Sequence, residues 1–183
     1  FVGIGGSGMS GIAEVLFNLG YTVTGSDKKE SDITNRLTDM GIEITYDHSA
    51  SNLKRVEMVV VSSAISESNP EIKEAKKRSI PVLARAEMLS SLMNTKRGIA
   101  IAGTHGKTST TSIVASIMTE AGLDPTFING GIINSFNSNA QLGKGKYLIA
   151  EADESDQSFL LLQPSMSIIT NIEPDHLVNY ENS

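Results

Sequence analysis

The sequence contains no cysteine and no tryptophan, and its hydrophobic runs are short. The lack of cysteine excludes disulfide bonds and thiolate chemistry, which is compatible with a cytoplasmic protein. No run approaches the roughly 18 apolar residues of a membrane-spanning helix, and no signal peptide is recognisable. We therefore expect no membrane association and a cytoplasmic location.

Basic residues are in the minority. The 183 residues carry a formal net charge of −6, and acidic and basic side chains are interspersed rather than grouped. A protein that binds nucleic acid would present a basic face, so no nucleic-acid partner is expected. Hydrophobic residues make up 39% of the chain and charged residues 20%, which is typical of a packed core in one large or two small domains.

A glycine-containing stretch in the middle of the chain indicates a phosphate-binding loop. The apolar run 98–102 predicts a buried strand and residues 110–121 predict a helix, with Gly-Thr-His-Gly-Lys-Thr-Ser between them. Such a loop offers backbone N–H groups and a lysine to anionic oxygens. The general pattern requires a glycine where this chain has Ile101, so the loop is a short form. The alternative is a tight turn that uses its glycines for geometry alone. The residues expected to bind the nucleotide cofactor are Gly103, Thr104, His105, Gly106, Lys107, Thr108 and Ser109.

A second glycine loop lies at the start of the chain. Gly3, Gly5 and Gly8 form the pattern G-x-G-x-x-G ahead of a helical stretch at 9–19. Asp27 follows about 20 positions later, where a dinucleotide-binding unit holds a ribose. The chemistry requires only a diphosphate, because a helix N-terminus binds pyrophosphate whatever is attached to it. Simple turn geometry is the alternative.

Strand and helix patterns alternate along the chain. This alternation predicts an α/β fold: a Rossmann-like parallel sheet in an N-terminal domain, then part of a P-loop-type α/β ATPase domain. The polar break 94–97 sets the expected boundary between domains 1–95 and 96–183, and both ends of the chain look cut, so we expect a fragment. The Asn- and Ser-rich stretch 135–141 is expected to be a loop. Further strands are expected at 21–25, 42–45, 57–61, 80–83, 126–128, 146–150 and 167–170, and further helices from residue 31 or 32 to 40, at 70–77 and at 85–93.

Polar residues gather where three of these strands end. Ser62 and Ser63 follow one strand, an acidic run at 151–156 follows another, and the polar run 171–176 follows a third. Carboxylates beside a phosphate loop suit Mg²⁺, although a solvated acidic turn is the alternative. The two serines could equally cap the next turn, and His48, in a loop, could simply be solvated.

Five motifs, distributed over nearly the whole chain, resemble the Mur ligases of peptidoglycan synthesis. The resemblance implies three domains, of which this chain would hold the first, for a UDP-sugar, and part of the second, an ATPase domain. It is strongest to members that join L-alanine to UDP-N-acetylmuramic acid. The motifs are G-x-G-G-x-G-M-S-G-I-A at 3–13, S-S-A-I at 62–65, G-T-H-G-K-T at 103–108, E-A-D-E-S-D at 151–156 and T-N-I-E-P-D-H at 170–176.

The resemblance also implies a mechanism, with ATP and Mg²⁺ as cofactors. The lactyl carboxylate of the sugar attacks the γ-phosphate, and the amino group of L-alanine then displaces phosphate. Lys107 and His176 are the implied catalytic residues, and Thr108, Glu151 and His176 the implied metal ligands. The implied substrate-binding residues are Gly5, Gly6, Ser7, Gly8, Met9, Ser10, Asp27, His48, Ser62 and Ser63.

Three other interpretations remain open at this point. A recycling ligase would attach a whole peptide to the same UDP-sugar. A nicotinamide-dependent oxidoreductase would explain the first glycine loop and Asp27, but not the second loop or the acidic strand end. A non-catalytic UDP-sugar-binding module is the third. Because the C-terminal domain of the family is missing, we expect this chain to be inactive alone, and the sequence assigns no oligomeric state.

Overall fold

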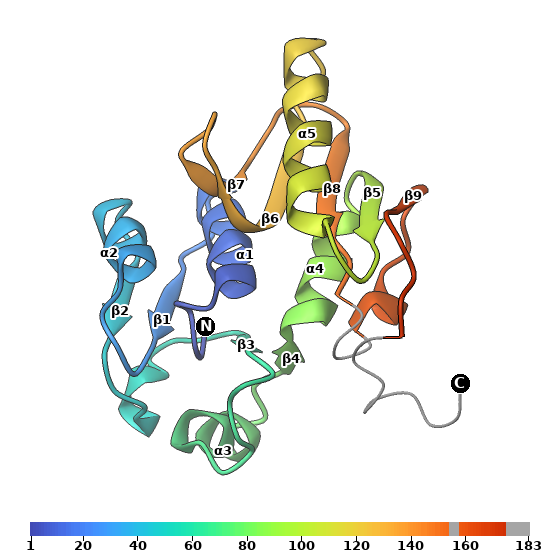
Figure 1. The fold of residues 1–183 in the computed structure, drawn as a ribbon. Helices are drawn as coiled ribbons and strands as arrows, with labels where there is room; N and C mark the ends of the chain where they lie inside the picture. The colour runs from blue at the N-terminus through green and yellow to red at the C-terminus, as the bar shows by residue number, and fades with distance from the viewer. Residues whose placement is uncertain (154–157, 175–183) are drawn as a thin grey trace. The chain divides into compact units, whose positions relative to one another are not determined.

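The computed structural model describes residues 1–153 and 158–174 of the chain (Figure 1). The chain divides into two compact units, Phe1–Met88 and Leu89–Ser183, and the division falls inside helix α4 (Arg85–Met93). The expected domain boundary after residue 95 follows that helix and stays a prediction. No helix among the described residues is long and apolar enough to cross a membrane.

The first unit is built on short parallel strands. β1 pairs with β2, β3 pairs with β4, and Val2 joins the two pairs because it bridges in parallel to Ser26 and to Val61. The spatial order is therefore β2, β1, Val2, β3, β4. All these pairings are parallel, but the chain adds strands first on one side of Val2 and then on the other, as in doubly wound folds. The elements are α1 (Ser7–Asn18), β1 (Thr24–Ser26), α2 (Asp32–Asp39), β2 (Glu43–Thr45), the 3₁₀ helix η1 (Ala50–Asn52), β3 (Val59–Val61), α3 (Pro70–Lys77) and β4 (Val82–Ala84).

Local sequence signals set the ends of these helices. The Ser31 hydroxyl accepts from the Thr34 N–H, and the Thr34 hydroxyl accepts from the Ser31 N–H, which is a capping box at the start of α2. Gly41 follows α2 with φ of +104°, a left-handed conformation that glycine adopts without strain. Asn69 caps α3 and is followed by Pro70 at the first helical position. The helices cover a core in which Ile4, Ala13, Val23, Leu37 and Ile42 pack together.

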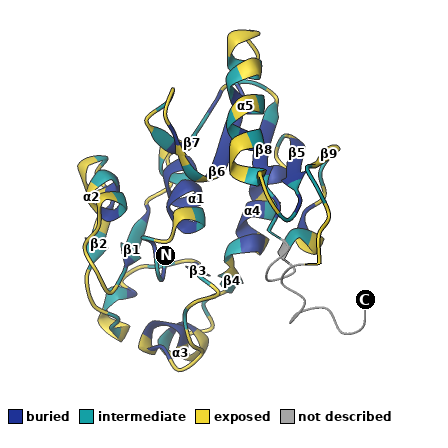
Figure 2. Cartoon of the chain, in the orientation of Figure 1, coloured by how far each residue is buried: buried dark blue, intermediate teal, exposed yellow. Residues whose placement is uncertain are grey.

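The second unit contains one five-stranded sheet in the order β7, β6, β8, β5, β9. All neighbouring pairs are parallel except β6 and β7. Figure 2 shows the middle strands in the buried class and much of α5 exposed. The core combines residues from the strands with Ala115 of α5. The elements are β5 (Arg97–Ala102), α5 (Lys107–Glu120), β6 (Thr126–Ile133), β7 (Ser138–Gln141), β8 (Tyr147–Glu151), the 3₁₀ helix η2 (Ser158–Leu161) and β9 (Met166–Ile169).

The ammonium of Lys96 ties two parts of the second unit together. Its Nζ donates to the carbonyls of Gly143 and Gly145 at 2.6 and 2.7 Å. Burial lowers the pKa of Lys96, and the nearby Asp124 carboxylate opposes that shift. The polar break predicted from the sequence therefore contains a residue that fixes the start of β5 against the loop before β8.

The α/β fold with parallel sheets is confirmed, but two local expectations are wrong. The expected loop 135–141 contains β7, and the expected strand 126–128 continues through residue 133. β6 and β7 pair in antiparallel fashion with an irregularity between Ile128 and Ile133. Asn139 is only 3% exposed, so pairing and burial override the weak strand preference of asparagine.

Candidate functional site

The first glycine loop runs from Gly3 to the start of α1. Gly3 has φ of +78°, and Gly6 precedes the helix with no side chain capping it. The N–H of Gly5 donates to Asp27 Oδ2 at 2.8 Å. A Cβ at residue 5 would lie 2.8 Å from that same oxygen, so only glycine fits beside the carboxylate. The structure therefore joins Asp27 to the loop directly, and its predicted contact with a ribose stays a prediction.

The two serines after β3 reach the same edge of the sheet. Ser62 donates its N–H to the Val2 carbonyl, and its Cβ lies 3.3 Å from the position of a Cβ on Gly3. Its hydroxyl also accepts from the Ala64 N–H at 3.3 Å, so the capping role that spacing left open is present. Because this edge is where the strand order reverses, Ser62 lies where open α/β sheets bind ligands.

Met9 and Ser10 face inward from the first turns of α1. Their side chains are 1% and 0% exposed, and their N–H groups donate to the Gly6 carbonyl at 3.0 and 2.8 Å. Their contribution at this edge is to support the turn. Gly6, Ser7 and Gly8 form the N-terminus of α1, where backbone N–H groups favour anions.

His48 lies in a buried polar cluster rather than in solvent. Its side chain is 9% exposed, and Nδ1 lies 3.1 Å from both Glu71 Oε1 and Ser26 Oγ. The Glu71 carboxylate also accepts from Ser26 Oγ at 2.9 Å and from Asn52 Nδ2 at 3.2 Å. Since an ionised carboxylate only accepts, this partner assigns the ring proton to Nδ1. The Nε2 atom is buried and has no hydrogen-bond partner among the described residues.

The sequence did not reveal Glu71, Ser26 or Arg85 as parts of this edge. Glu71 stands in the first turn of α3, where an acid is ordinary. Arg85 begins α4, and its guanidinium lies 3.2 Å from the position of a Cβ on Gly8. No spacing rule connects residues so far apart in the chain, so only the folded arrangement identifies them.

The second glycine loop connects β5 to α5. Gly103 and Gly106 have φ of +130° and +81°, and α5 begins at Lys107 rather than at residue 110 as expected. Lys107 Nζ donates to the Gly103 carbonyl at 2.6 Å and to the Thr104 carbonyl at 3.3 Å. The lysine thus folds over its own loop, and no side chain caps the helix N-terminus. This arrangement concentrates positive charge at the end of β5.

Two oxygen-bearing side chains adjoin this loop. Glu151 ends β8 opposite Ile101, and its Oε1 accepts from the Gly130 N–H at 2.8 Å. Thr108 Cγ2 lies 3.2 Å from the position of a Cβ on Gly131, the next residue of β6. Thr108 and Glu151 therefore lie against adjacent residues of one strand. A hydroxyl and a carboxylate are the type of donor that Mg²⁺ prefers.

His176 and most of the acidic run lie outside the described residues. Within residues 1–153 and 158–174, no three His, Cys, Asp or Glu side chains are grouped as a metal site. The described residues thus include two of the three expected metal ligands, Thr108 and Glu151, and metal binding stays a prediction for all three.

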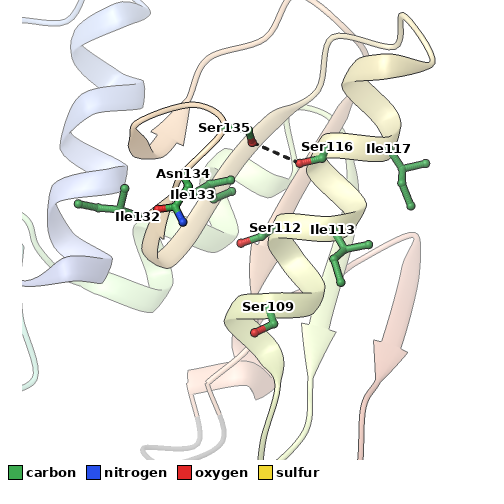
Figure 3. Close-up of a pocket in the computed structure, with 9 residues that line it drawn as sticks. All are labelled: Ser109, Ser112, Ile113, Ser116, Ile117, Ile132, Ile133, Asn134 and Ser135. Atoms are coloured by element: carbon green, nitrogen blue, oxygen red, sulfur yellow. Dashed lines mark hydrogen bonds between the residues drawn. The ribbon is translucent and has the colours of Figure 1, made fainter.

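A groove of about 480 Å³ runs along α5 beside the hairpin of β6 and β7 (Figure 3). Ser109, Ser112 and Ile113 line it on the helix, and Ile132 and Asn134 line it on the other side. Its lower end begins at Ser109, so the groove adjoins the phosphate loop. Ile113 and Ile132 are more than half exposed, so the groove is a shallow surface.

Known protein families match nearly the whole chain. The model of the "Mur ligase family, catalytic domain" matches residues 1–97, and that of the "Mur ligase middle domain" matches residues 101–183. A curated relative from Pelobacter propionicus, named UDP-N-acetylmuramate--L-alanine ligase, is 62% identical over 98% of this chain and 39% of its own length. A relative of the same name from Dichelobacter nodosus is 60% identical over 100% of this chain and 38% of its own.

Solved structures show the same similarity. The UDP-N-acetylmuramate-alanine ligase of Thermotoga maritima has a TM-score of 0.93 and 38% identity, covering 100% of this chain and 43% of that one. A UDP-N-acetylmuramate:L-alanyl-gamma-D-glutamyl-meso-diaminopimelate ligase from Neisseria meningitides has a TM-score of 0.90 and 26% identity, covering 99% and 62%. This chain thus spans about two fifths of the length of the curated relatives it matches.

The fold and its two glycine loops define a class of α/β protein with parallel sheets and loops of the phosphate-binding type. Within that class, the chain belongs to the Mur ligase family, because matching family models cover both of its units.

Proposed function

We propose that the protein containing this chain is an ATP-dependent ligase that joins L-alanine to UDP-N-acetylmuramic acid in peptidoglycan synthesis. The observation that carries the proposal is the loop Gly103–Thr108, with Lys107 at the start of α5 and Glu151 on the strand next to β5. Curated relatives about 60% identical to this chain carry the corresponding name. Because ATP and UDP-sugars are cytoplasmic metabolites, the proposal implies a cytoplasmic location.

In this proposal the second domain, residues 96–183, binds ATP and Mg²⁺. The residues fit these groups because the loop needs glycine at 103, where a Cβ would lie 2.1 Å from Thr170 Oγ1, and because the two described metal ligands, Thr108 and Glu151, offer oxygens. Thr108 and Glu151 would hold Mg²⁺ with His176, and Mg²⁺ would neutralise charge on the phosphoryl oxygens. Lys107 would leave its loop carbonyls and stabilise the transferring phosphoryl group, and residues 103–109 would surround the phosphates.

The first domain, residues 1–95, would hold the UDP-sugar. Gly5, Gly6, Ser7 and Gly8 would bind the diphosphate through their backbone at the start of α1. Asp27 and one of the serines at 62–63 would contact the uridine. His48 would act from the buried cluster with Glu71, so its ring orientation is fixed before substrate arrives.

The decisive experiment measures phosphate release by the full-length protein. The proposal expects ATP-dependent release that requires both UDP-N-acetylmuramic acid and L-alanine. Release with the L-alanyl-γ-D-glutamyl-diaminopimelate peptide instead of L-alanine would identify the recycling ligase, whose relative has the same fold. No release with either acceptor would leave a non-catalytic binding module.

A binding experiment tests the role proposed for the first domain. In isothermal titration of this chain, heat is expected with UDP-N-acetylmuramic acid and none with NAD. The opposite result would favour an oxidoreductase and contradict the ligase proposal.

A further inference from the structure

The second glycine loop is held from one side by the residues that follow β9. Thr170 donates its hydroxyl to the carbonyl of His105 at 2.5 Å and lies 3.3 Å from the carbonyl of Ala102. Farther along, the Glu173 N–H donates to the Thr104 hydroxyl at 3.0 Å. The side chains of His105 and Glu173 approach to 3.8 Å but are both more than half exposed. The loop is therefore fixed mainly through its backbone.

Asn171 makes the most specific of these contacts. Its Oδ1 accepts from the His105 N–H at 2.9 Å, and its Nδ2 donates to the His105 carbonyl at 3.2 Å. The backbone carbonyl of Asn171 also accepts from the Thr104 N–H at 3.3 Å. One carboxamide thus satisfies both polar groups of a single loop residue, which fixes the orientation of the peptide planes on both sides of His105.

Fixing this residue matters because a glycine-containing loop is costly to order. Of the four residues 103–106 that precede α5, two are glycines with positive φ, and glycine loses more conformational entropy on ordering than any other residue. A loop that is ordered before nucleotide arrives does not lose that entropy on binding. Positioning of phosphate ligands is also most of what a protein contributes to phosphoryl transfer.

The contact also determines which donors face the nucleotide. The His105 N–H is directed at Asn171, so it is already satisfied within the protein. The backbone donors left for phosphate are those at and after Gly106, at the start of α5, together with the ammonium of Lys107. A short loop can thus present a compact donor set without the extra glycine of the longer pattern.

We propose that Asn171 is a positioning residue for the phosphate loop: it fixes the His105 backbone and so restricts phosphate binding to the donors at and after Gly106 and to Lys107. The inference rests on the proposed ATP-dependent function. Asn171 acts through the loop and does not touch the reacting atoms.

The test uses the full-length protein with two variants, Asn171→Ala and Asn171→Asp, and an exposed control of the same type, Asn94→Ala. Steady-state phosphate release gives kcat and the KM for ATP, and titration gives the Kd for UDP-N-acetylmuramic acid. Asn171→Ala is expected to lower kcat/KM for ATP by about 10²-fold, the scale of a displaced catalytic geometry, with an unchanged Kd for the UDP-sugar. The control is expected to match the wild type.

The second variant separates positioning from general structure. Asn171→Asp keeps an acceptor for the His105 N–H but directs a carboxylate oxygen at the His105 carbonyl. The hydrogen bond to the His105 carbonyl is then lost while the one from its N–H is kept, so kcat/KM for ATP is expected to fall below the wild-type value with an unchanged Kd for the UDP-sugar. A wild-type kcat/KM in Asn171→Asp would contradict the role of the second hydrogen bond.

The outcomes also separate this inference from the proposed function. Wild-type turnover together with unchanged kcat/KM in Asn171→Ala overturns the inference alone. Equal losses of ATP and UDP-sugar affinity in that variant would show general unfolding and also overturn it. A wild-type protein that releases no phosphate contradicts the proposed function itself.

Discussion

Each glycine loop has a His–Glu pair close by, and the two pairs differ in almost every respect. In the first unit, His48 and Glu71 approach to 3.1 Å with side chains 9% and 3% exposed. In the second unit, His105 and Glu173 lie 3.8 Å apart with side chains 62% and 57% exposed. The first pair is enclosed in a hydrogen-bonded cluster, and the second is solvated.

If the proposed function holds, this difference gives two ways to prepare an anion-binding edge. The first loop is stabilised by an acid, because Asp27 accepts from the Gly5 N–H. The second loop contains Lys107, whose ammonium donates to loop carbonyls and would turn to phosphate in the proposed reaction. In the first loop, the fixed carboxylate of Asp27 suits a ligand that is held without reacting at this edge. In the second loop, the ammonium of Lys107 suits a phosphate group whose charge changes during the reaction. Four experiments test this comparison, in order of decreasing expected effect.

Removal of the Lys107 ammonium is expected to have the largest effect. Lys107→Ala in the full-length protein should lower turnover on the order of 10³-fold, because no other described side chain of the loop carries a full positive charge. Binding of the UDP-sugar should be unchanged. Phosphate release and titration measure the two quantities, with the exposed Lys144→Ala as the control. Retained turnover in Lys107→Ala would refute the assigned role.

The two His–Glu pairs can be compared directly by urea unfolding. Glu71→Ala removes a buried acceptor that serves three donors, so the free energy of unfolding should fall by about 3 kcal/mol. Glu173→Ala removes an exposed partner and should change it by less than about 0.5 kcal/mol. Similar losses in the two variants would contradict the contrast drawn between the pairs.

A Cβ added to either loop should affect only the ligand of that loop. Gly103→Ala would put the new carbon 2.1 Å from Thr170 Oγ1 at a φ of +130°, and Gly5→Ala would put it 2.8 Å from Asp27 Oδ2. We expect affinity to fall by about 10-fold for ATP in the first variant and for the UDP-sugar in the second. Each variant is the control for the other, because each leaves the other loop unchanged.

Each variant is titrated with both ligands. If the loops are independent, Gly103→Ala weakens only ATP binding and Gly5→Ala weakens only UDP-sugar binding. Weakening of both ligands by one substitution would show that the loops do not act separately.

The smallest effect is expected from the charge of the fixed acid. Asp27→Asn retains an acceptor for the Gly5 N–H but places an amide against the N–H groups of Lys28 and Lys29. The Kd for the UDP-sugar should rise about 3- to 10-fold, the value of one hydrogen bond. An unchanged Kd would show that Asp27 only shapes the backbone.

Much of this architecture could be predicted from local sequence. Helices α3 and α4 have the predicted bounds, because Asn69-Pro70 and the apolar spacing of 85–93 specify them locally. Both glycine loops also open the predicted helices, and the second follows its predicted strand. These features depend on residues within a few positions of one another, where propensity and capping act.

What could not be predicted depends on partners far apart in the chain. β7 is a strand only because β6 lies beside it, and His48 is buried only because Glu71 and Ser26 surround its ring. Likewise, Asn171 is one of several polar residues after a strand in the sequence, and only the fold brings its side chain to His105. The roles assigned to individual site residues remain predictions for the experiments above.

The contact between Asn171 and His105 spans 66 positions of sequence, and this has a consequence for folding. The loop cannot acquire its final backbone until the ribosome has released the segment after β9, because loop closure over such a distance requires β8 and β9 to be in place on either side of β5. Nascent chains that end before residue 171 should carry an intact Gly-Lys-Thr sequence without its shape. The order of synthesis therefore makes a competent phosphate loop a late product of folding, although its residues are translated early.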